Sequence, residues 1–339
     1  MGMRLLLAGN STARDLIGGF VPPPCQSASL PSIDWRWVDD VLEFDLELGL
    51  TTAPGDDGLQ ILPGFSAVSG NSYSFQFSLT WTAPGGNPLT VFLSPVGAAG
   101  PFLEPVADAG LAARSQIDFF TATGELADAR LKIQVSAEDL SELADAPSLL
   151  SVSVRTVDAA TVFADAPKTE TKIDIPVPAL SQMVDAKLGA RLCSPTSVTM
   201  VVSHYGLPVQ LQQVAEMAYH PFHDLYGVWP AALYAASRHY LLGYLIWFSD
   251  WEAARWLLDR GVPIIASIRY KEGELEGAVV ASTAGHLVVV RGYDADSVLV
   301  NDPAADRADQ VARSYSFAQF LRAWLHGSGV GYVLFPASH

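Results

Sequence analysis

The spacing of hydrophobic and polar positions divides the chain into two parts that predict different structures. Up to about residue 170, short alternating runs are separated by turn residues, and the clearest run, residues 72–81, places five large hydrophobic side chains on one face. Further runs lie at 35–50, 89–93, 117–123, 129–135 and 149–157, whereas 137–146 is either a short helix or an acidic loop. Strands separated by turn signals are typical of an antiparallel sandwich. We therefore predict an antiparallel β-sandwich over residues 1–170, with an extended linker or last strand at 167–178.

After residue 176 the spacing changes to helical periods and unbroken hydrophobic runs. Val198, Val201, Val202 and Tyr205 recur at the i, i+3, i+4 and i+7 positions of one helix face, which predicts a helix beginning near Cys193. Helices are also expected at 209–219, 231–242, 249–260 (opened by a capping box from Ser249 to Glu252) and 316–325, and strands at 261–269, 284–294, 296–301 and 331–335. The second part, residues 176–339, therefore predicts a separate domain, and the whole chain is of the α+β class.

Composition supports this boundary and excludes some partners. Half of the residues are hydrophobic and the net charge is −16, but residues 1–175 hold 9 Lys and Arg against 22 Asp and Glu, whereas residues 176–339 hold 11 against 14. An acidic chain lacks the clustered cations that bind nucleic acid, so no nucleic-acid partner is expected. No hydrophobic run approaches the roughly 20 residues of a membrane helix, so no membrane span is expected.

Cys193 is the side chain for which the sequence most clearly predicts chemical reactivity. It lies at the predicted start of a helix, where unpaired N–H groups and the helix dipole lower the pKa of a thiol and favour the nucleophilic thiolate. The alternative for any single cysteine is a buried structural role. The second cysteine, Cys25, has no histidine in its own half, because all seven histidines lie after residue 200. This asymmetry favours Cys193 as the reactive cysteine.

A predicted hairpin supplies partners for that thiol. His286 opens one strand and Asp302 ends the returning strand, 16 residues later, so two antiparallel strands bring both to the same end of the hairpin. A carboxylate there can orient the imidazole through one ring nitrogen while the other faces a thiol. Taken singly, His286 is better explained as a satisfied sheet-edge histidine and Asp302 as a turn residue before Pro303. Their occurrence together with a helix-start cysteine that follows a glutamine favours the catalytic interpretation.

Two other groups of side chains have alternative interpretations. His220, His223 and Asp224 have metal-ligand chemistry but lack a fourth ligand and lie beside Pro and Gly, so a loop is favoured and no metal site is expected. Trp35, Trp37 and Trp81 are either a sugar-stacking platform or, as favoured here, part of the sandwich core.

Six blocks of the second part resemble the C39-like cysteine peptidase family, the double-glycine peptidase group. They are VPALSQ, CSPTS, YGVWP, GVPIIASI, GHLVVVRGYD and VLVNDP, in this order, and they cover about residues 176–337. The resemblance implies a papain-like fold with Cys193 as nucleophile, His286 as general acid and base, and Asp302 as its orienter. It also implies that Gln182 binds the oxyanion together with the backbone of Cys193. Trp229 and Gly285 are expected to line the substrate groove.

The sequence therefore predicts a cysteine hydrolase that cleaves a peptide bond through a thioester, acting on a peptide or protein without metal or organic cofactor. Two alternatives remain open: a catalytically silent papain-like protein that holds peptides, and an acyl transferase using the same residues. The first residues lack the hydrophobic core of a signal peptide, which favours the cytoplasm. An extracellular location stays open, because C39-like relatives are often exported, and the sequence does not determine the oligomeric state.

Overall fold

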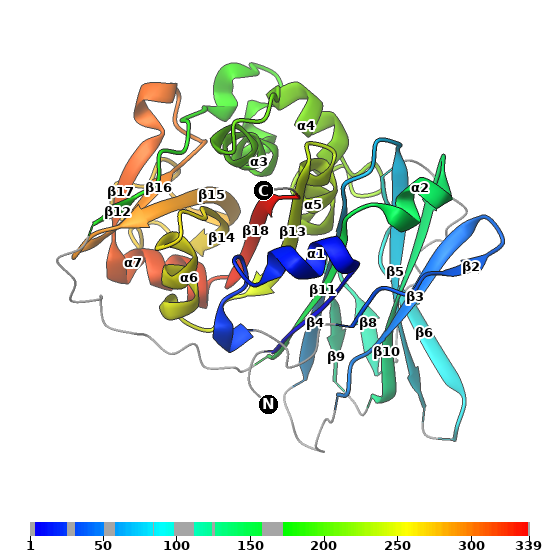
Figure 1. The fold of residues 1–339 in the computed structure, drawn as a ribbon. Helices are drawn as coiled ribbons and strands as arrows, with labels where there is room; N and C mark the ends of the chain where they lie inside the picture. The colour runs from blue at the N-terminus through cyan, green and yellow to red at the C-terminus, as the bar shows by residue number, and fades with distance from the viewer. Residues whose placement is uncertain are drawn as a thin grey trace.

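Three antiparallel sheets organise the chain. The computed structural model describes residues 4–25, 31–50, 58–83, 85–97, 112–123, 126–157 and 172–337. In Figure 1 the first half of the chain forms two sheets on the right, and the second half forms a third sheet with helices on the left. The α+β class, with a sandwich followed by a mixed domain, is confirmed.

The first two sheets are made from strands of the first half. Sheet A has the order β1 (Arg4–Gly9), β11 (Ser148–Thr156), β4 (Leu59–Ala67), β9 (Phe120–Ala122) and β8 (Ala113–Ser115). Sheet B has the order β2 (Arg36–Val38), β3 (Val41–Glu47), β10 (Ala127–Ala137), β5 (Tyr73–Thr82) and β6 (Pro88–Phe92), and β7 (Val96–Gly97) also pairs with β5. The short helices α1 (Ser11–Ile17) and α2 (Leu140–Asp145) and a 3₁₀ turn (Pro23–Cys25) join them.

The alternating pattern of β5 fills the core between these sheets, as the sequence predicts. Phe75, Phe77 and Trp81 are at most 2% exposed and belong to one hydrophobic cluster with the inward side chains of β4, β10 and β11. Trp37 is different, because it lies on the edge strand β2 and is 56% exposed. The segment 137–146, for which the sequence left a short helix or an acidic loop open, contains helix α2, capped by the carboxylate of Asp139.

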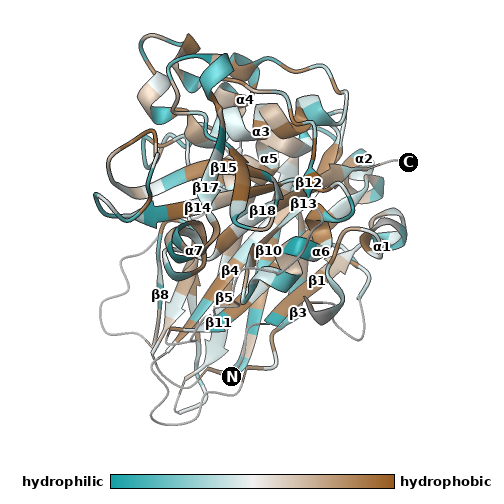
Figure 2. Cartoon of the chain, turned by 90° about the vertical axis from the view of Figure 1, so that its left-hand side faces the viewer, coloured by the Kyte–Doolittle hydropathy of each residue, from teal (hydrophilic) through white to brown (hydrophobic). Residues whose placement is uncertain are grey.

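The second half forms sheet C and the helices around it. Its strand order is β13 (Leu241–Trp247), β18 (Val330–Pro336), β14 (Ile264–Tyr270), β15 (Thr283–Tyr293), β16 (Ser297–Asn301) and β17 (Ala312–Ser316), and β12 (Ile173–Asp174) pairs with β15. The helices are α3 (Cys193–His204), α4 (Leu211–Ala218), α5 (Trp229–Ser237), α6 (Trp251–Leu258) and α7 (Phe317–Leu321), the last continued by a π-helical turn (Arg322–His326). Hydrophobic strands occupy the interior and polar loops and helix turns the outside (Figure 2).

Two sequence predictions about this half are wrong. The helix expected at 231–242 ends at Ser237, because Tyr240 adopts a positive φ of 63° and turns the chain into β13. All seven residues of β13 are buried, so the run has no strand periodicity to reveal it. The capping residue of α6 is Asp250, whose carboxylate accepts the Ala253 N–H, rather than Ser249.

The two halves meet where the edge strand β13 lies against sheet A. Serine hydroxyls of sheet A bond the backbone of β13: Ser66 bonds both the N–H and the C=O of Gly243 at 3.0 Å, and Ser151 and Ser153 accept the next N–H groups on the same side. Gly64 allows the close approach, since a Cβ there would lie 2.8 Å from Leu233 Cδ1. Because an unpaired strand edge needs partners, these hydroxyls explain why the halves pack together. The expected linker at 167–178 lies outside the described residues up to residue 171.

Across the part of the chain that the structure describes, none of the helices is both long and hydrophobic enough to span a membrane.

Candidate active site

Cys193 is the first residue of α3, as its sequence context predicts. It is half-buried, while the helix residues from Ser194 to Val202 are buried on all sides. The hydroxyl of Ser197 donates to the Leu287 carbonyl at 3.2 Å and ties this helix to β15. The thiol therefore lies at a helix N-terminus, where unpaired N–H groups and the dipole stabilise negative charge.

His286 and Asp302 meet at the end of the β15–β16 hairpin. His286 Nε2 lies 2.7 Å from Asp302 Oδ1, and the side chains are 7% and 0% exposed. The thiol of Cys193 interacts with His286, since each group shifts the pKa of the other. Because Nε2 is taken by the carboxylate, Nδ1 is the ring nitrogen left for this interaction. The hairpin thus brings together the three residues that the sequence singled out.

The charges of the pair follow from these contacts. Burial by itself raises the pKa of the Cys193 thiol, but the hydrogen bond and charge of His286, with the backbone N–H groups of Leu287 and Ser194, lower it below its usual value. Burial likewise opposes the charge on His286, but Asp302 and Cys193 outweigh it and raise its pKa to about 10. The lowered pKa of Cys193 and the raised pKa of His286 both favour a thiolate beside an imidazolium, the reactive state of a catalytic cysteine.

Asp302 has two further hydrogen-bond donors, neither of them predicted from the sequence. The hydroxyl of Tyr315, on β17, donates to Asp302 Oδ2 over 2.8 Å, and the Ala304 N–H donates to Oδ1 over 3.1 Å. Burial alone would raise the pKa of Asp302, but the hydrogen bonds and the charge of His286 hold it below its usual range. Only the pairing of β16 with β17, which aligns Val298 with Tyr315, brings this hydroxyl near the carboxylate.

Gln182 lies beside this hairpin in a 3₁₀ turn, Gln182–Val184. Its backbone N–H donates to the Pro303 carbonyl over 2.8 Å, which ties the turn to the residue after Asp302. The side chain is 4% exposed, and its Oε1 has no hydrogen-bond partner among the described residues. A buried amide with a free oxygen is costly to keep in a purely structural role, so an acceptor site for a ligand N–H or water is favoured here.

Two surface pockets flank the site. One, of ≈ 430 Å³, is bordered by Leu192, directly before Cys193, and by hydrophobic side chains of the neighbouring turns and α4. The other, of ≈ 720 Å³, is bordered by Ala284, two residues before His286. Gly285, expected in the substrate groove, lies exposed between Ala284 and His286.

Trp229, the other expected groove residue, lines neither pocket. It starts α5 and faces the first half of the chain, where its ring stacks on Phe119 with centroids 6.2 Å apart. The backbone N–H of Trp229 donates to Asp118 Oδ1 over 2.6 Å, so a side chain of the β8–β9 hairpin caps this helix. Its role in a groove stays a prediction.

The other candidate cluster does not converge. The rings of His220 and His223 stack with centroids 4.8 Å apart, and Asp224 instead pairs with Arg191 at 2.9 Å. His223 Nε2 contacts the hydroxyl of Ser94 at 3.0 Å. Within the described ranges, no three His, Cys, Asp or Glu side chains are placed to hold a metal ion. The segment forms a turn that is closed by a backbone bridge between His220 and Leu225.

Residues 174–332 match the model of the Peptidase_C39 like family. A protein from Bacillus anthracis described as a C39-like peptidase is similar at 19% identity and a TM-score of 0.37, over 49% of this chain and 98% of that one. A double glycine motif protease from an AMS/PCAT transporter, solved with its leader peptide, is similar at 20% and 0.35, over 49% and 99%. The peptidase domain of Streptococcus ComA, a bifunctional ABC transporter of a quorum-sensing pathway, is similar at 19% and 0.34, over 47% and 98%. Among curated proteins, none matches the chain.

Proposed function

Residues 174–332 form a domain of the Peptidase_C39-like family, and from this premise we propose that the protein is a cysteine peptidase with Cys193 as its nucleophile. The observation that carries the proposal is the position of His286, whose Nε2 lies 2.7 Å from Asp302 Oδ1 and whose ring interacts with Cys193, each shifting the pKa of the other. This is the arrangement that acyl transfer by a thiol needs: a nucleophile, a base beside it, and a group that orients the base.

The chemistry follows from these contacts. The Cys193 thiolate attacks the carbonyl carbon of the peptide bond, and the carbonyl oxygen becomes an oxyanion. The backbone N–H of Cys193, in the first turn of α3, and the side-chain amide of Gln182 are the donors proposed to bind it, and removing one such donor typically costs about 3 kcal/mol in the transition state. The His286 imidazolium gives its proton to the leaving amine, and a thioester on Cys193 remains.

Water completes the cycle. His286, now neutral, takes a proton from water as the water attacks the thioester carbonyl; the C–S bond then breaks, the acid product leaves, and the Cys193 thiolate is restored beside the His286 imidazolium. Asp302, held by Tyr315 and Ala304, keeps Nδ1 of the imidazole directed at the sulfur throughout. The substrate is a peptide or protein, and neither metal nor organic cofactor is required by these steps.

Alkylation tests the activated thiol, and Cys25 is an internal control for it. Burial raises the pKa of Cys25 to about 11, so at pH 6 its thiolate is scarce. With limiting iodoacetamide and peptide mapping, Cys193 should react at least about 100-fold faster than Cys25, and His286→Gln should remove most of this difference. Equal rates at the two cysteines would contradict the proposal.

Digestion of a peptide library tests the reaction itself. The wild type and Cys25→Ala should cleave the same peptides, whereas Cys193→Ala should cleave none. Added glycinamide separates transfer from hydrolysis, because a transferase would leave products carrying the amine. Binding of library peptides without any cleavage would instead support the silent peptide-holding alternative.

A further inference from the structure

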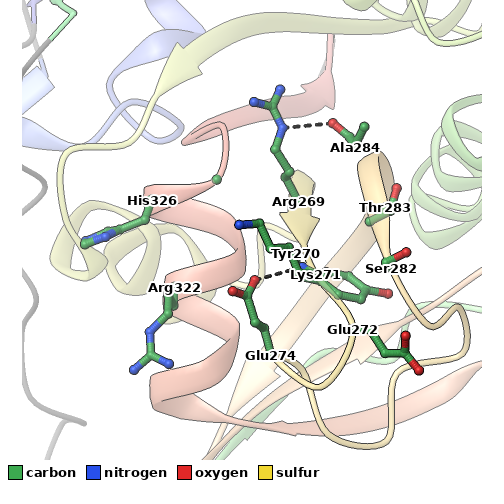
Figure 3. A pocket seen from close by; sticks show the side chains of 11 residues that line it. Arg269, Tyr270, Lys271, Glu272, Glu274, Ser282, Thr283, Ala284, Arg322 and His326 are labelled. Carbon is green, nitrogen blue, oxygen red and sulfur yellow. Dashed lines mark hydrogen bonds between the residues drawn. The ribbon is translucent and has the colours of Figure 1, made fainter.

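The larger of the two pockets, bordered by Ala284, is lined by several cations. Its cations come from three places: Arg269 at the end of β14, Lys271 in the loop that follows, and Arg322 on the π-helical turn (Figure 3). All three are exposed, and no ion pair joins any of them to a carboxylate of the described residues. In a chain with a net charge of −16, three unpaired cations around one pocket form a local positive site.

Two carboxylates also line the pocket, so its cations exceed its carboxylates by one. Glu274 accepts the backbone N–H of Lys271 over 2.7 Å and thereby closes the loop, and Glu272 is the second carboxylate on the lining. Arg269 also interacts with a further cation, Arg155: burial, and then repulsion from Arg269, lowers the pKa of Arg155 to about 10. Cations that repel one another at a surface are stabilised by an anion that enters between them.

The sheet places this positive site next to the proposed catalytic histidine. Ile268 pairs with His286 across β14 and β15, and Arg269 and Ala284 follow on the side of the pocket. Arg269 Nε donates to the Ala284 carbonyl over 2.9 Å, so its guanidinium lies at the strand end that leads into His286. Since a strand rises about 3.3 Å per residue, Ala284 lies roughly 7 Å along the strand from His286. The pocket therefore begins about two residues along β15 from the proposed catalytic histidine.

We propose that this pocket is a subsite for a carboxylate of the substrate, bound by Lys271 and Arg322 with the guanidinium of Arg269. The proposal rests on the proposed peptidase function and adds to it a preference for acidic peptides. Ammonium and guanidinium groups bind carboxylates through charge-assisted hydrogen bonds, which are stronger than neutral ones. The carboxylate comes either from an Asp or Glu side chain or from the free C-terminus of the peptide, and both present the same chemistry to the pocket.

Cleavage of matched peptides tests the preference and separates the two sources. In library peptides that the wild type cleaves, Glu is placed at each position in turn and compared with Gln, with a free or an amidated C-terminus. We expect one position at which Glu raises kcat/KM about tenfold or more over Gln. A gain from the free C-terminus alone would assign the pocket to the terminal carboxylate.

Charge reversal ties that preference to the pocket. In Lys271→Glu combined with Arg322→Glu, the preferred residue at the same position should become Lys. The matched control, Arg130→Gln combined with Arg260→Gln, removes two cations from elements that do not border the pocket, and should keep the preference for Glu. A wild type that cleaves Glu, Gln and Lys peptides at equal rates would overturn the subsite and leave the peptidase proposal standing.

Binding provides a readout that does not depend on cleavage. Deca-L-glutamate should bind the Cys193→Ala protein, binding should weaken as salt is added, and the Lys271→Gln and Arg322→Gln double variant should weaken it about tenfold or more. If no library peptide is cleaved, the peptidase proposal fails, and this titration still decides the carboxylate site. Equal affinity of the double variant and the Arg130→Gln and Arg260→Gln control would refute it.

Discussion

Removal of the Tyr315 hydroxyl tests the environment of the buried Asp302 carboxylate most directly. In Tyr315→Phe the ring remains stacked on Phe320, with 6.2 Å between centroids, and only the donor to Asp302 Oδ2 is lost. Asp302 is 0% exposed, so water does not easily replace that donor, although His286 and the Ala304 N–H remain. A hydrogen bond to a buried charge contributes about 1.5–3 kcal/mol. We expect the free energy of unfolding at pH 7 to fall by that amount.

The same substitution should change the response to acid. The pKa of Asp302 is held low by His286 and Tyr315 against the opposing effect of burial, and 1.36 kcal/mol corresponds to about one pKa unit. Losing one donor should therefore raise this pKa. A carboxylate with a lowered pKa stabilises the fold above its unfolded pKa, near 4, and loses that contribution as the pH falls through its folded pKa. The variant should therefore lose the contribution of Asp302 at a higher pH than the wild type.

Urea unfolding between pH 3 and 7 measures both effects, and Tyr219 offers a matched control. Its hydroxyl also donates to an aspartate, Asp224 Oδ1 at 3.1 Å, but at the surface. Because exposed polar pairs contribute about 0–1 kcal/mol, Tyr219→Phe should change stability little. If the two Tyr→Phe variants lose the same stability, or if the acid transition of Tyr315→Phe does not move, the reasoning about the buried carboxylate is wrong.

Two further predictions concern the thiolate–imidazolium pair and the joint between the halves. The raised pKa of His286, about 10, stabilises the fold fully below the unfolded value near 6.5 and is lost toward pH 10, whereas the lowered pKa of Cys193 stabilises it fully above the unfolded value near 8.5. Between the lowered pKa of Cys193 and about pH 8.5 the rise from Cys193 should offset the decline from His286, so in denaturant titrations the stability of the wild type should fall less steeply with pH than that of Cys193→Ala. An equal decline in both proteins would contradict the coupled pair. At the joint, Gly64→Ala places a Cβ 2.8 Å from Leu233 Cδ1 and from Ser151 Oγ, and should cost about 1–3 kcal/mol in thermal or urea unfolding. Gly18→Ala, with no atom within 4 Å of its Cβ, should cost less, and equal losses would show that the packing at the joint is loose.

The residues of the candidate site were predictable because their signals are local. A cysteine before a helical period places the thiol at a helix start. A histidine that begins the first strand of a hairpin and an aspartate that ends the second strand lie at the same open end of that hairpin, whatever surrounds them. The register of β14 and β15, and of β15 and β16, agrees with this expectation. The alternation of β5 likewise predicted a sandwich strand, since one of its faces lies against the core.

Other features depended on which segments meet in space. Sheet A is buried on both faces, by the sandwich core and by β13, so β4 lacks the alternation that revealed β5, and β13 itself is an unbroken hydrophobic run that resembled the end of a helix. Asp250 rather than Ser249 caps α6, because the choice between adjacent capping residues depends on the backbone angle at which the chain enters the helix.

The sequence by itself determined the two-part order of the chain and the three side chains of the candidate site, because periodicity and turn chemistry act over neighbouring residues. Only the tertiary structure decided which hydroxyl holds Asp302, which serines cover the edge of β13, and that Lys271 and Arg322 share one pocket. These contacts join residues from 13 to 177 positions apart, and no local pattern encodes which strands will pair or which faces will pack.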